Sequence, residues 1–437
     1  MLKNKFVKNL SWIFFGNIAH AFFQFVMNIV AARILTTESF GTINYSASLI
    51  TFFTAVGTLG FNHILTKYYA EREDSAGVYT GTAIFSRLVT AILSIAIIQI
   101  IVRITDPGNV LLYIIVLCQS ITVLFGAFDS FVYWFRYKNQ AKVVAVVRLV
   151  AFLISAIFRL LILLTTKDII WYVVACSSET LIFSVFLLIE YIKRRNQRLS
   201  FSKGVFFRML KLSYPFIFSA LLSTIYGQTD KIMLKQLMST DSVAYYSVSL
   251  TLAGAISIIP IALIDGFRPE IMKYKISDTK LYAKKLRQLY SVVFWICIAY
   301  GIFVSIFSRA IILIAYGEKY LPAATSLATI VWYTSFSYFG SINNIYMVCE
   351  NKTVFVQITT FVGAVLNIGL NFALIPVFGV EGAAVASLAT QIIINFLVPA
   401  IIPSLRPCFR FMVEGIAFRD TFSLKWRKNN EHTHFHK

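Results

Sequence analysis

The chain has 437 residues, of which 58% are hydrophobic and 14% charged, and its mean hydropathy is +0.73. Soluble domains are roughly 45–50% apolar and about 25% charged, so this composition excludes an ordinary soluble globular domain. The formal net charge of +20 would suggest a nucleic-acid partner in a soluble protein, but its meaning here depends on where the charges lie.

Long apolar stretches recur along the whole chain. A helix that spans lipid needs about 20 mainly apolar residues, because its backbone groups find no water to bond. The sequence holds about twelve such stretches, which predicts an all-α integral membrane protein with about twelve transmembrane helices. In chain order the predicted spans are 9–33, 40–63, 79–103, 109–135, 143–164, 169–192, 210–232, 242–265, 288–314, 323–347, 354–377 and 383–405.

The basic residues are concentrated in the tails and in every second loop between predicted spans. If the N-terminus is cytoplasmic, about 30 of the 40 Lys and Arg fall in the tails and in alternate loops on the same side. This predicts that both termini are cytoplasmic. The densest basic loops, within 193–211 and 268–287, are expected to set this topology and to contact the anionic head groups of membrane lipids. Nucleic acid is not expected as a partner.

The long basic loop after the sixth span divides the chain into two halves. It predicts a six-helix lobe over 1–192, a basic cytoplasmic linker over 193–209, a second six-helix lobe over 210–405 and a cytoplasmic tail over 406–437. A faint internal repeat at an offset of 202 supports this division, since Asn17 falls on Ser219 and Asn28 on Asp230. Six crossings give both halves the same orientation, which predicts a cleft between two lobes.

A polar stripe runs along one face of the first span and of the seventh. Such a stripe faces either a neighbouring helix, through hydrogen bonds, or a water-filled cleft, and the matching positions in the two halves favour the cleft. Pro215 predicts a bend near the cytoplasmic end of the seventh span. The predicted cavity-lining residues are Asn17, His20, Gln24 and Asn28 in the first span and Ser219, Ser223, Tyr226 and Asp230 in the seventh.

Charged residues inside spans are rare and mark candidate sites. Arg87, Arg148 and Arg159 either extend to a membrane interface or form a cationic wall that binds an anionic substrate, since guanidinium groups bind phosphate in bidentate fashion. Glu179 is the acidic residue nearest a membrane midplane. It must be paired or protonated, which leaves open an ion pair with Arg159 or a role in ion coupling.

Motifs for catalysis are missing from the sequence. It contains no P-loop, HExxH or GxSxG motif and no paired carboxylates in an external loop, and its five cysteines lack metal-like spacing. We therefore expect a transporter rather than an enzyme, with no metal site and no cofactor. Coupling to a proton or sodium-ion gradient stays open.

Short motifs in a fixed order resemble the Wzx-type polysaccharide flippase family, within the multidrug/oligosaccharidyl-lipid/polysaccharide (MOP) exporter superfamily. They are Ala32-Arg33-Ile34-Leu35, Glu38-Ser39-Phe40-Gly41, Tyr45-Ser46, Gly57-Thr58-Leu59-Gly60-Phe61, Thr229-Asp230-Lys231-Ile232-Met233-Leu234, Tyr245-Tyr246-Ser247, Tyr316-Gly317-Glu318-Lys319-Tyr320 with Ala323-Ala324, and Leu366-Asn367 through Leu374-Ile375-Pro376-Val377-Phe378-Gly379-Val380-Glu381-Gly382-Ala383-Ala384. The resemblance covers most of the chain.

The resemblance implies a MATE-like V of two six-helix bundles and alternating access. It also implies a substrate, an undecaprenyl-diphosphate-linked oligosaccharide for O-antigen, capsule or another exopolysaccharide, moved from the cytoplasmic to the outer face of a bacterial inner membrane. A polysaccharide polymerase and a chain-length regulator are candidate partners. In such families, cavity arginines are thought to hold the anionic part of the substrate, which fits Arg87, Arg148 and Arg159 by location.

Two alternatives remain. A cation-coupled multidrug exporter of the same superfamily is less favoured, because the charge inside the spans is mainly cationic. A membrane polysaccharide polymerase is disfavoured, because the predicted external loops are short.

Overall fold

A computed structural model of the chain describes residues 2–195 and 197–417, without the side chains of residues 2–15, 17 and 73. Within these ranges the chain is helical and has no strand. The N-terminal half contains α1 (Leu2–Ile34), α2 (Thr37–Gly57), η1 (Phe61–His63), α3 (Leu65–Glu71), η2 (Glu73–Ser75), α4 (Ala76–Thr105), α5 (Val110–Phe125), η3 (Gly126–Asp129), α6 (Ser130–Tyr137), α7 (Ala141–Leu164) and α8 (Ile169–Arg194). The C-terminal half contains α9 (Lys203–Leu237), α10 (Thr240–Ala253), η4 (Gly254–Ser257), α11 (Ile258–Ser277), α12 (Thr279–Ala315), η5 (Glu318–Tyr320), α13 (Ala323–Cys349), α14 (Thr353–Ile392), the π-helical turn η6 (Ile393–Leu397), α15 (Val398–Ile401), η7 (Pro403–Leu405) and α16 (Arg406–Ile416).

By length and composition, eight described helices are able to cross a membrane, or nine if the bent α2–α3 segment is one span. Three features separate the count of nine from the predicted twelve spans. The described apolar part of α1, Ile18–Ile34, is too short for the criterion, α13 is not among the helices that meet it, and Thr353–Ile401 counts once although it covers the last two predicted spans. The number twelve therefore stays a prediction, whereas the all-helical membrane fold is confirmed.

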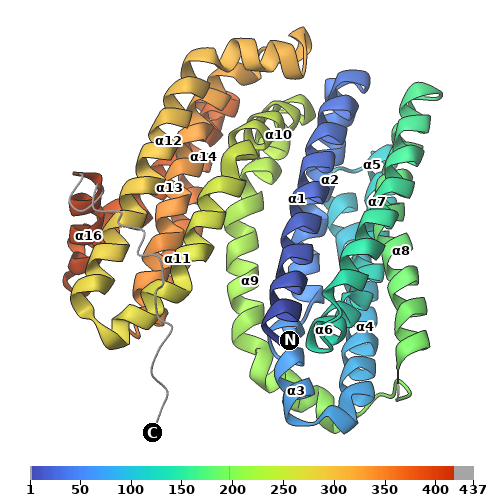
Figure 1. Ribbon diagram of the computed structural model, residues 1–437. Helices are drawn as coiled ribbons and strands as arrows, with labels where there is room; N and C mark the ends of the chain where they lie inside the picture. The colour runs from blue at the N-terminus through green and yellow to red at the C-terminus, as the bar shows by residue number, and fades with distance from the viewer. Residues whose placement is uncertain (1, 196, 418–437) are drawn as a thin grey trace, which may run out of the picture.

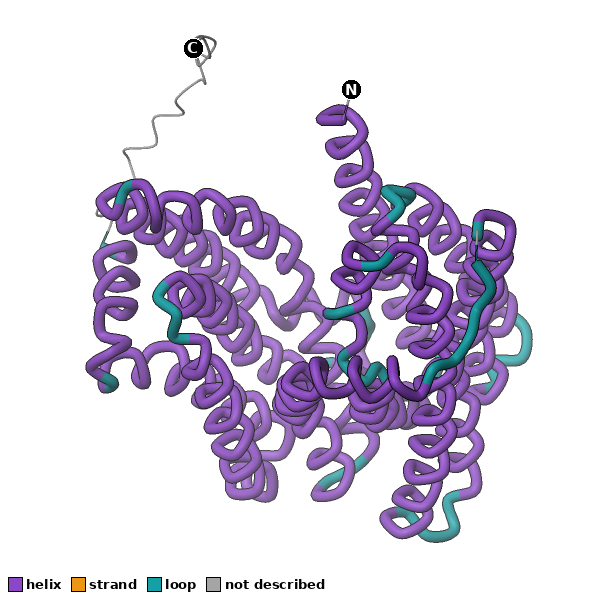
Figure 2. The backbone as a smooth tube through the Cα atoms, turned by 90° about the horizontal axis from the view of Figure 1, so that it is seen from below, coloured by secondary structure: helices purple, strands orange, loops and turns teal. Residues whose placement is uncertain are grey.

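The helices form two bundles that lie side by side (Figures 1 and 2). In the first, α1 packs on α7, α7 on α8, and α5 on α2, α4 and α8; in the second, α13 packs on α10, α12 and α14. Contacts between the bundles run mainly through α2, which packs on both α9 and α10. Large apolar side chains stay exposed on the outward faces of α4, α7 and α12, where lipid covers them; Ile92, Ile157 and Ile306 are 60%, 60% and 69% exposed.

The segment that joins the halves is held against α4. Gly77 N donates to the side chain of Gln197 over 2.7 Å, and Ser202 N donates to Thr82 Oγ1 over 3.1 Å. At Gly81 a Cβ atom would lie 2.5 Å from the Ser200 carbonyl oxygen, so glycine permits this close approach. Beyond it, α9 continues as one helix through Pro215 and bends at its N-terminal end (Figure 1).

Two further features refine the predicted C-terminal organisation. Gly379 has φ +59°, in the left-handed region, and forms the turn inside α14 between the last two predicted spans. The predicted tail from residue 406 begins as a helix, because α16 packs against α12 and buries Cys408 and Met412. The remainder of that tail, 418–437, lies outside the described residues.

Candidate functional site

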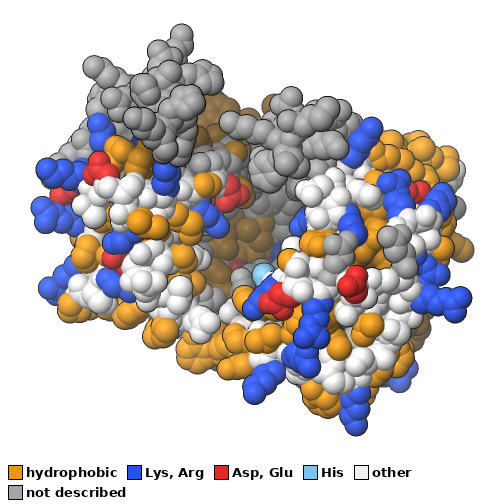
Figure 3. Space-filling model, turned by 60° about the horizontal axis from the view of Figure 1, so that its bottom comes forward, with side chains coloured by type: hydrophobic (Ala, Val, Ile, Leu, Met, Phe, Trp, Pro, Cys, Tyr) orange, Lys and Arg blue, Asp and Glu red, His pale blue; other side chains and the backbone are white. Residues whose placement is uncertain are grey.

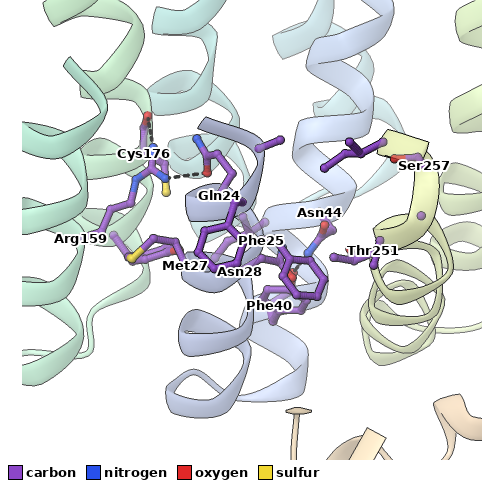
Figure 4. A pocket seen from close by; sticks show the side chains of 17 residues that line it. Gln24, Phe25, Met27, Asn28, Phe40, Asn44, Arg159, Cys176, Thr251 and Ser257 are labelled. Carbon is purple, nitrogen blue, oxygen red and sulfur yellow. Dashed lines mark hydrogen bonds between the residues drawn. The ribbon is translucent and has the colours of Figure 1, made fainter. Parts of the chain in front are cut away.

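A hollow opens between the two bundles on the face where α8 is joined to α9 (Figure 3). Residues of both bundles also line a pocket of about 680 Å³, which we call the Arg159 pocket. Its N-terminal wall comes from α1, α2, α7 and α8, and its C-terminal wall from α10, η4 and α11. The pocket is amphipathic, since Arg159, Gln24, Asn28 and Asn44 face the same space as several aromatic and aliphatic side chains (Figure 4).

The polar side of this pocket is a hydrogen-bonded network centred on Glu179 of α8. Its carboxylate accepts hydrogen bonds from Arg159 over 2.5 Å, from Gln24 Nε2 over 2.9 Å and from His20 Nε2 at 2.7 Å. Arg159 also donates to Gln24 Oε1 over 3.0 Å, while its Nε atom is buried with no hydrogen-bond partner in the structure. The structure thus contains the ion pair of Glu179 with Arg159, one of the two roles that the sequence left open, and joins it to the polar stripe of α1.

Spacing in the sequence explains this convergence. His20 and Gln24 are four residues apart, so they lie on one face of α1. That face packs against α7, which carries Arg159, and α7 packs in turn against α8, which carries Glu179. Arg159 is 4% exposed, and a guanidinium at this depth requires partners because an unpaired buried charge is very costly.

Arg87 and Arg148 do not line this pocket. Arg87 on α4 is 2% exposed and donates to Thr58 O over 3.1 Å, to Ser130 Oγ over 2.9 Å and to Asn62 Oδ1. These bonds make it a structural link within the first bundle. Arg148 on α7 packs over the ring of Phe183, with 4.9 Å between the guanidinium carbon and the ring centroid. The expected wall of three arginines is therefore reduced to Arg159.

The stripe on α9 also differs from the prediction. Asp230 is 5% exposed and turned into the second bundle, where Asn371 and Ser387 donate to its carboxylate over 2.5 and 2.6 Å and Tyr246 OH donates as well. The Ser219 hydroxyl donates to the carbonyl of Pro215 within α9. None of the four predicted α9 residues, Ser219, Ser223, Tyr226 and Asp230, lines the Arg159 pocket, and the Asn17 side chain lies outside the described residues.

The second wall of the pocket was missed by sequence reasoning. It is made by Thr251, Gly254, Ala255, Ser257 and Ile258, where α10 gives way to the 3-10 turn η4. These residues carry no charge and form no long polar stripe, so the only signal available was the interruption of the predicted eighth span by Gly254.

At the opposite end from the hollow, the bundles are joined by cations that bind helix C-termini. Arg33 at the end of α1 donates from Nε to Ala315 O at the end of α12 over 2.7 Å, and a second nitrogen donates to Ile314 O. Lys319, which follows α12, donates to the carbonyls of Arg33 and Leu35 over 3.0 and 2.5 Å. Each helix end, negative by its macrodipole, is thus bound by a cation from the other bundle.

We call these reciprocal contacts of Arg33 and Lys319 the outer latch. Tyr316 OH adds a hydrogen bond of 3.1 Å to Asn28 Oδ1, and elsewhere on the same face Lys235 of α9 forms an ion pair with Asp106 at 2.5 Å. Burial lowers the pKa of Lys319 from its ordinary value. The bundles are therefore held together at the face opposite the hollow.

The comparisons with known proteins agree with this geometry. Residues 6–265 match the family model described as polysaccharide biosynthesis protein. The fold is similar to the lipid II flippase MurJ in an inward closed conformation, with TM-score 0.70 and 16% identity over 97% of this chain and 94% of that one. It is also similar to an inward-facing multidrug resistance MATE family transporter of the MOP superfamily, with TM-score 0.64 and 13% identity over 90% and 95% of the two chains. A search of curated proteins finds no significant match.

Two helical bundles with a pocket between them are thus the fold that this chain shares with the MurJ and MATE structures. The chain belongs to the polysaccharide biosynthesis protein family, whose model matches more than half of its length.

Proposed function

We propose that this protein is a flippase that moves an undecaprenyl-diphosphate-linked oligosaccharide repeat unit from the cytoplasmic to the outer face of a bacterial inner membrane. The observation that carries the proposal is a buried arginine in an amphipathic pocket between two bundles. These bundles are separated by a hollow at one face and latched at the other. An amphipathic, anionic lipid requires both the cation and the apolar walls. The positive-inside pattern predicts that the face with the hollow is cytoplasmic.

In this proposal Glu179 holds Arg159 while no cargo is bound. Both terminal nitrogens of the guanidinium are engaged, one with Gln24 and the other with Glu179. A substrate diphosphate therefore binds by replacing the Glu179 carboxylate, and guanidinium groups form bidentate bonds to either anion. Neutralisation of the Glu179 carboxylate, by a proton from His20 or by a bound sodium ion, would assist that exchange. Coupling to a proton or sodium-ion gradient therefore stays within the proposal.

After loading, the cycle requires the outer latch to open and the cytoplasmic face to close. Rocking of one bundle against the other about the α2 contacts provides this alternating access. The polymerase and chain-length regulator expected as partners would then receive the unit at the outer face.

Export of the repeat unit in cells tests the proposal. A strain that lacks the protein should lose surface polysaccharide and accumulate complete, unpolymerised lipid-linked units, and Arg159→Ala should not restore export at normal protein levels. Arg148→Ala is the matched control, since it removes an arginine of the same helix that does not line the pocket. Full export by Arg159→Ala would contradict the proposed site.

The second candidate is a cation-coupled multidrug exporter, favoured only by the likeness in fold to MATE transporters. Changed drug susceptibility on deletion, with normal polysaccharide, would select it.

A further inference from the structure

A second pocket lies along α2, beyond the part of that helix that lines the Arg159 pocket. It has a volume of about 560 Å³, and its walls come from α2, η1, α5, α8 and α9. Small-molecule sites typically measure roughly 300–1,000 Å³, so it is large enough for a ligand. Cys176 lines both pockets, which makes them neighbours. We call the second one the polar pocket.

Most residues that line the polar pocket are polar and uncharged, although carbon atoms make up the larger part of its surface. Nine of its residues carry a hydroxyl, amide or imidazole group, and none is an Asp, Glu, Lys or Arg. Its chemistry therefore differs from that of the first pocket, where Arg159 and Glu179 form an ion pair. A lining without fixed charge suits an uncharged polar ligand and gives a diphosphate no cation to bind.

Two residues that line the polar pocket each carry a buried polar atom without a hydrogen-bond partner in the structure. Gln119 Oε1 and Ser177 Oγ are buried and have no hydrogen-bond partner in the structure; their residues are 7% and 1% exposed. The hydroxyls of Thr51 and Thr54 donate to carbonyls of their own helix over 2.7 and 2.8 Å, so their lone pairs remain as acceptors. A buried polar atom without a partner costs about 1–3 kcal/mol, which a ligand with hydroxyl donors would recover.

We infer that the polar pocket is a glycan subsite, which binds an uncharged sugar of the lipid-linked oligosaccharide while the Arg159 pocket binds its diphosphate. The inference rests on the proposed function and adds to it the part of the site that contacts the sugar. Ala220 and Thr224 of α9 form one wall, whereas the other walls belong to the first bundle. Movement of the bundles therefore changes the shape of the subsite, which ties sugar binding to the transport cycle.

The test compares two ligands on the purified full-length protein in lipid nanodiscs. One is a short-chain prenyl diphosphate that carries the complete repeat unit of the host, and the other is the same prenyl diphosphate without sugar. The double variant Thr54→Val, Ser177→Ala removes two hydroxyls, and Thr224→Leu fills the pocket. The control is Thr360→Val, because the Thr360 hydroxyl also donates over 2.8 Å to the carbonyl four residues before it but lies in neither pocket.

Loss of two hydroxyl contacts should weaken binding of the glycan-bearing ligand about tenfold and leave that of the bare diphosphate unchanged. Thr224→Leu should act in the same direction, and the control should match the parent. Equal loss for both ligands, or no loss for either, would overturn the glycan subsite and leave a pocket that holds water only. If the parent protein binds neither ligand, the proposed function fails first and the inference fails with it.

Discussion

Removal of the outer latch should shift the protein towards its other conformation. Arg33→Ala deletes two hydrogen bonds from a cation to the carbonyls of Ile314 and Ala315. A hydrogen bond to a charged group contributes a net stabilisation of about 1.5–3 kcal/mol. Arg33 is exposed and solvent screens its charge, so we expect its loss to destabilise the closed outer face by about 1–2 kcal/mol in total. That amount changes the ratio of the two conformations about 5- to 30-fold in favour of the open outer face.

Lys319→Met should have a similar effect, and the double variant should shift the conformations further than either change alone. Lys319 bonds the backbone oxygen of Arg33 rather than its side chain, so Arg33→Ala leaves the Lys319 contacts in place. Because Lys319 contacts Arg33 directly, a double-mutant cycle measures how strongly the two effects depend on each other.

Spin labels at Thr166 in the first bundle and Glu318 in the second report the separation of the outer face by double electron–electron resonance. The parent should give one short-distance population, and each latch variant should add a longer one. Arg103→Ala is the matched control, because the Arg103 guanidinium packs on Tyr113 within the same bundle. Unchanged distances in the double variant would refute the latch.

Three further predictions concern single residues. Arg87→Ala should lower the free energy of unfolding by about 1–3 kcal/mol for each buried group left unpaired, seen as reduced thermal stability in detergent, because its side chain bonds only within the first bundle. Glu179→Gln should strengthen binding of a prenyl diphosphate, since it releases Arg159 from its ion pair; unchanged affinity would show that Glu179 does not compete with substrate. Burial lowers the pKa of Lys319, so its ammonium group should lose its proton at a pH below the ordinary lysine pKa of about 10.4. Raising the pH should therefore open the latch in the same distance measurement. Lys319→Arg should prevent this opening, because arginine keeps its charge.

The sequence predicted the fold class because the rule behind it is local. Lipid requires every spanning segment to be a long apolar helix, and that pattern is visible without tertiary information. The four-residue spacing of His20, Gln24 and Asn28 likewise gave their common face directly. The structure brings Gln24 and Asn28 to a pocket, although their contact with substrate stays a prediction.

The predictions for single site residues depended on the rotation of each helix about its own axis, which decides where its side chains face. Arg87 and Arg159 both lie inside apolar helices, and nothing in their local sequence distinguishes a side chain held by Asn62 and Ser130 from one that faces a pocket. Asp230 was expected in the cleft for the same reason, but α9 turns it towards Asn371 and Ser387. Rotation of a helix about its axis is set by its packing partners, which hydropathy does not reveal.

Two of the short motifs that carry the family resemblance meet in the structure. Arg33 and Lys319 belong to motifs almost three hundred residues apart, and the structure unites them in the outer latch. No pattern of paired charges predicts this contact, since each partner of the two cations is a backbone carbonyl.

The central claim is that this protein moves a lipid-linked oligosaccharide across the membrane, and the side on which that molecule accumulates tests it most directly. In a strain without the protein, lipid-linked repeat units should be complete and inaccessible to a glycan-modifying enzyme added outside intact cells, and restoring the protein should make them accessible. Repeat units that reach the outer face at the normal rate without the protein, in a strain with no other flippase, would contradict the account.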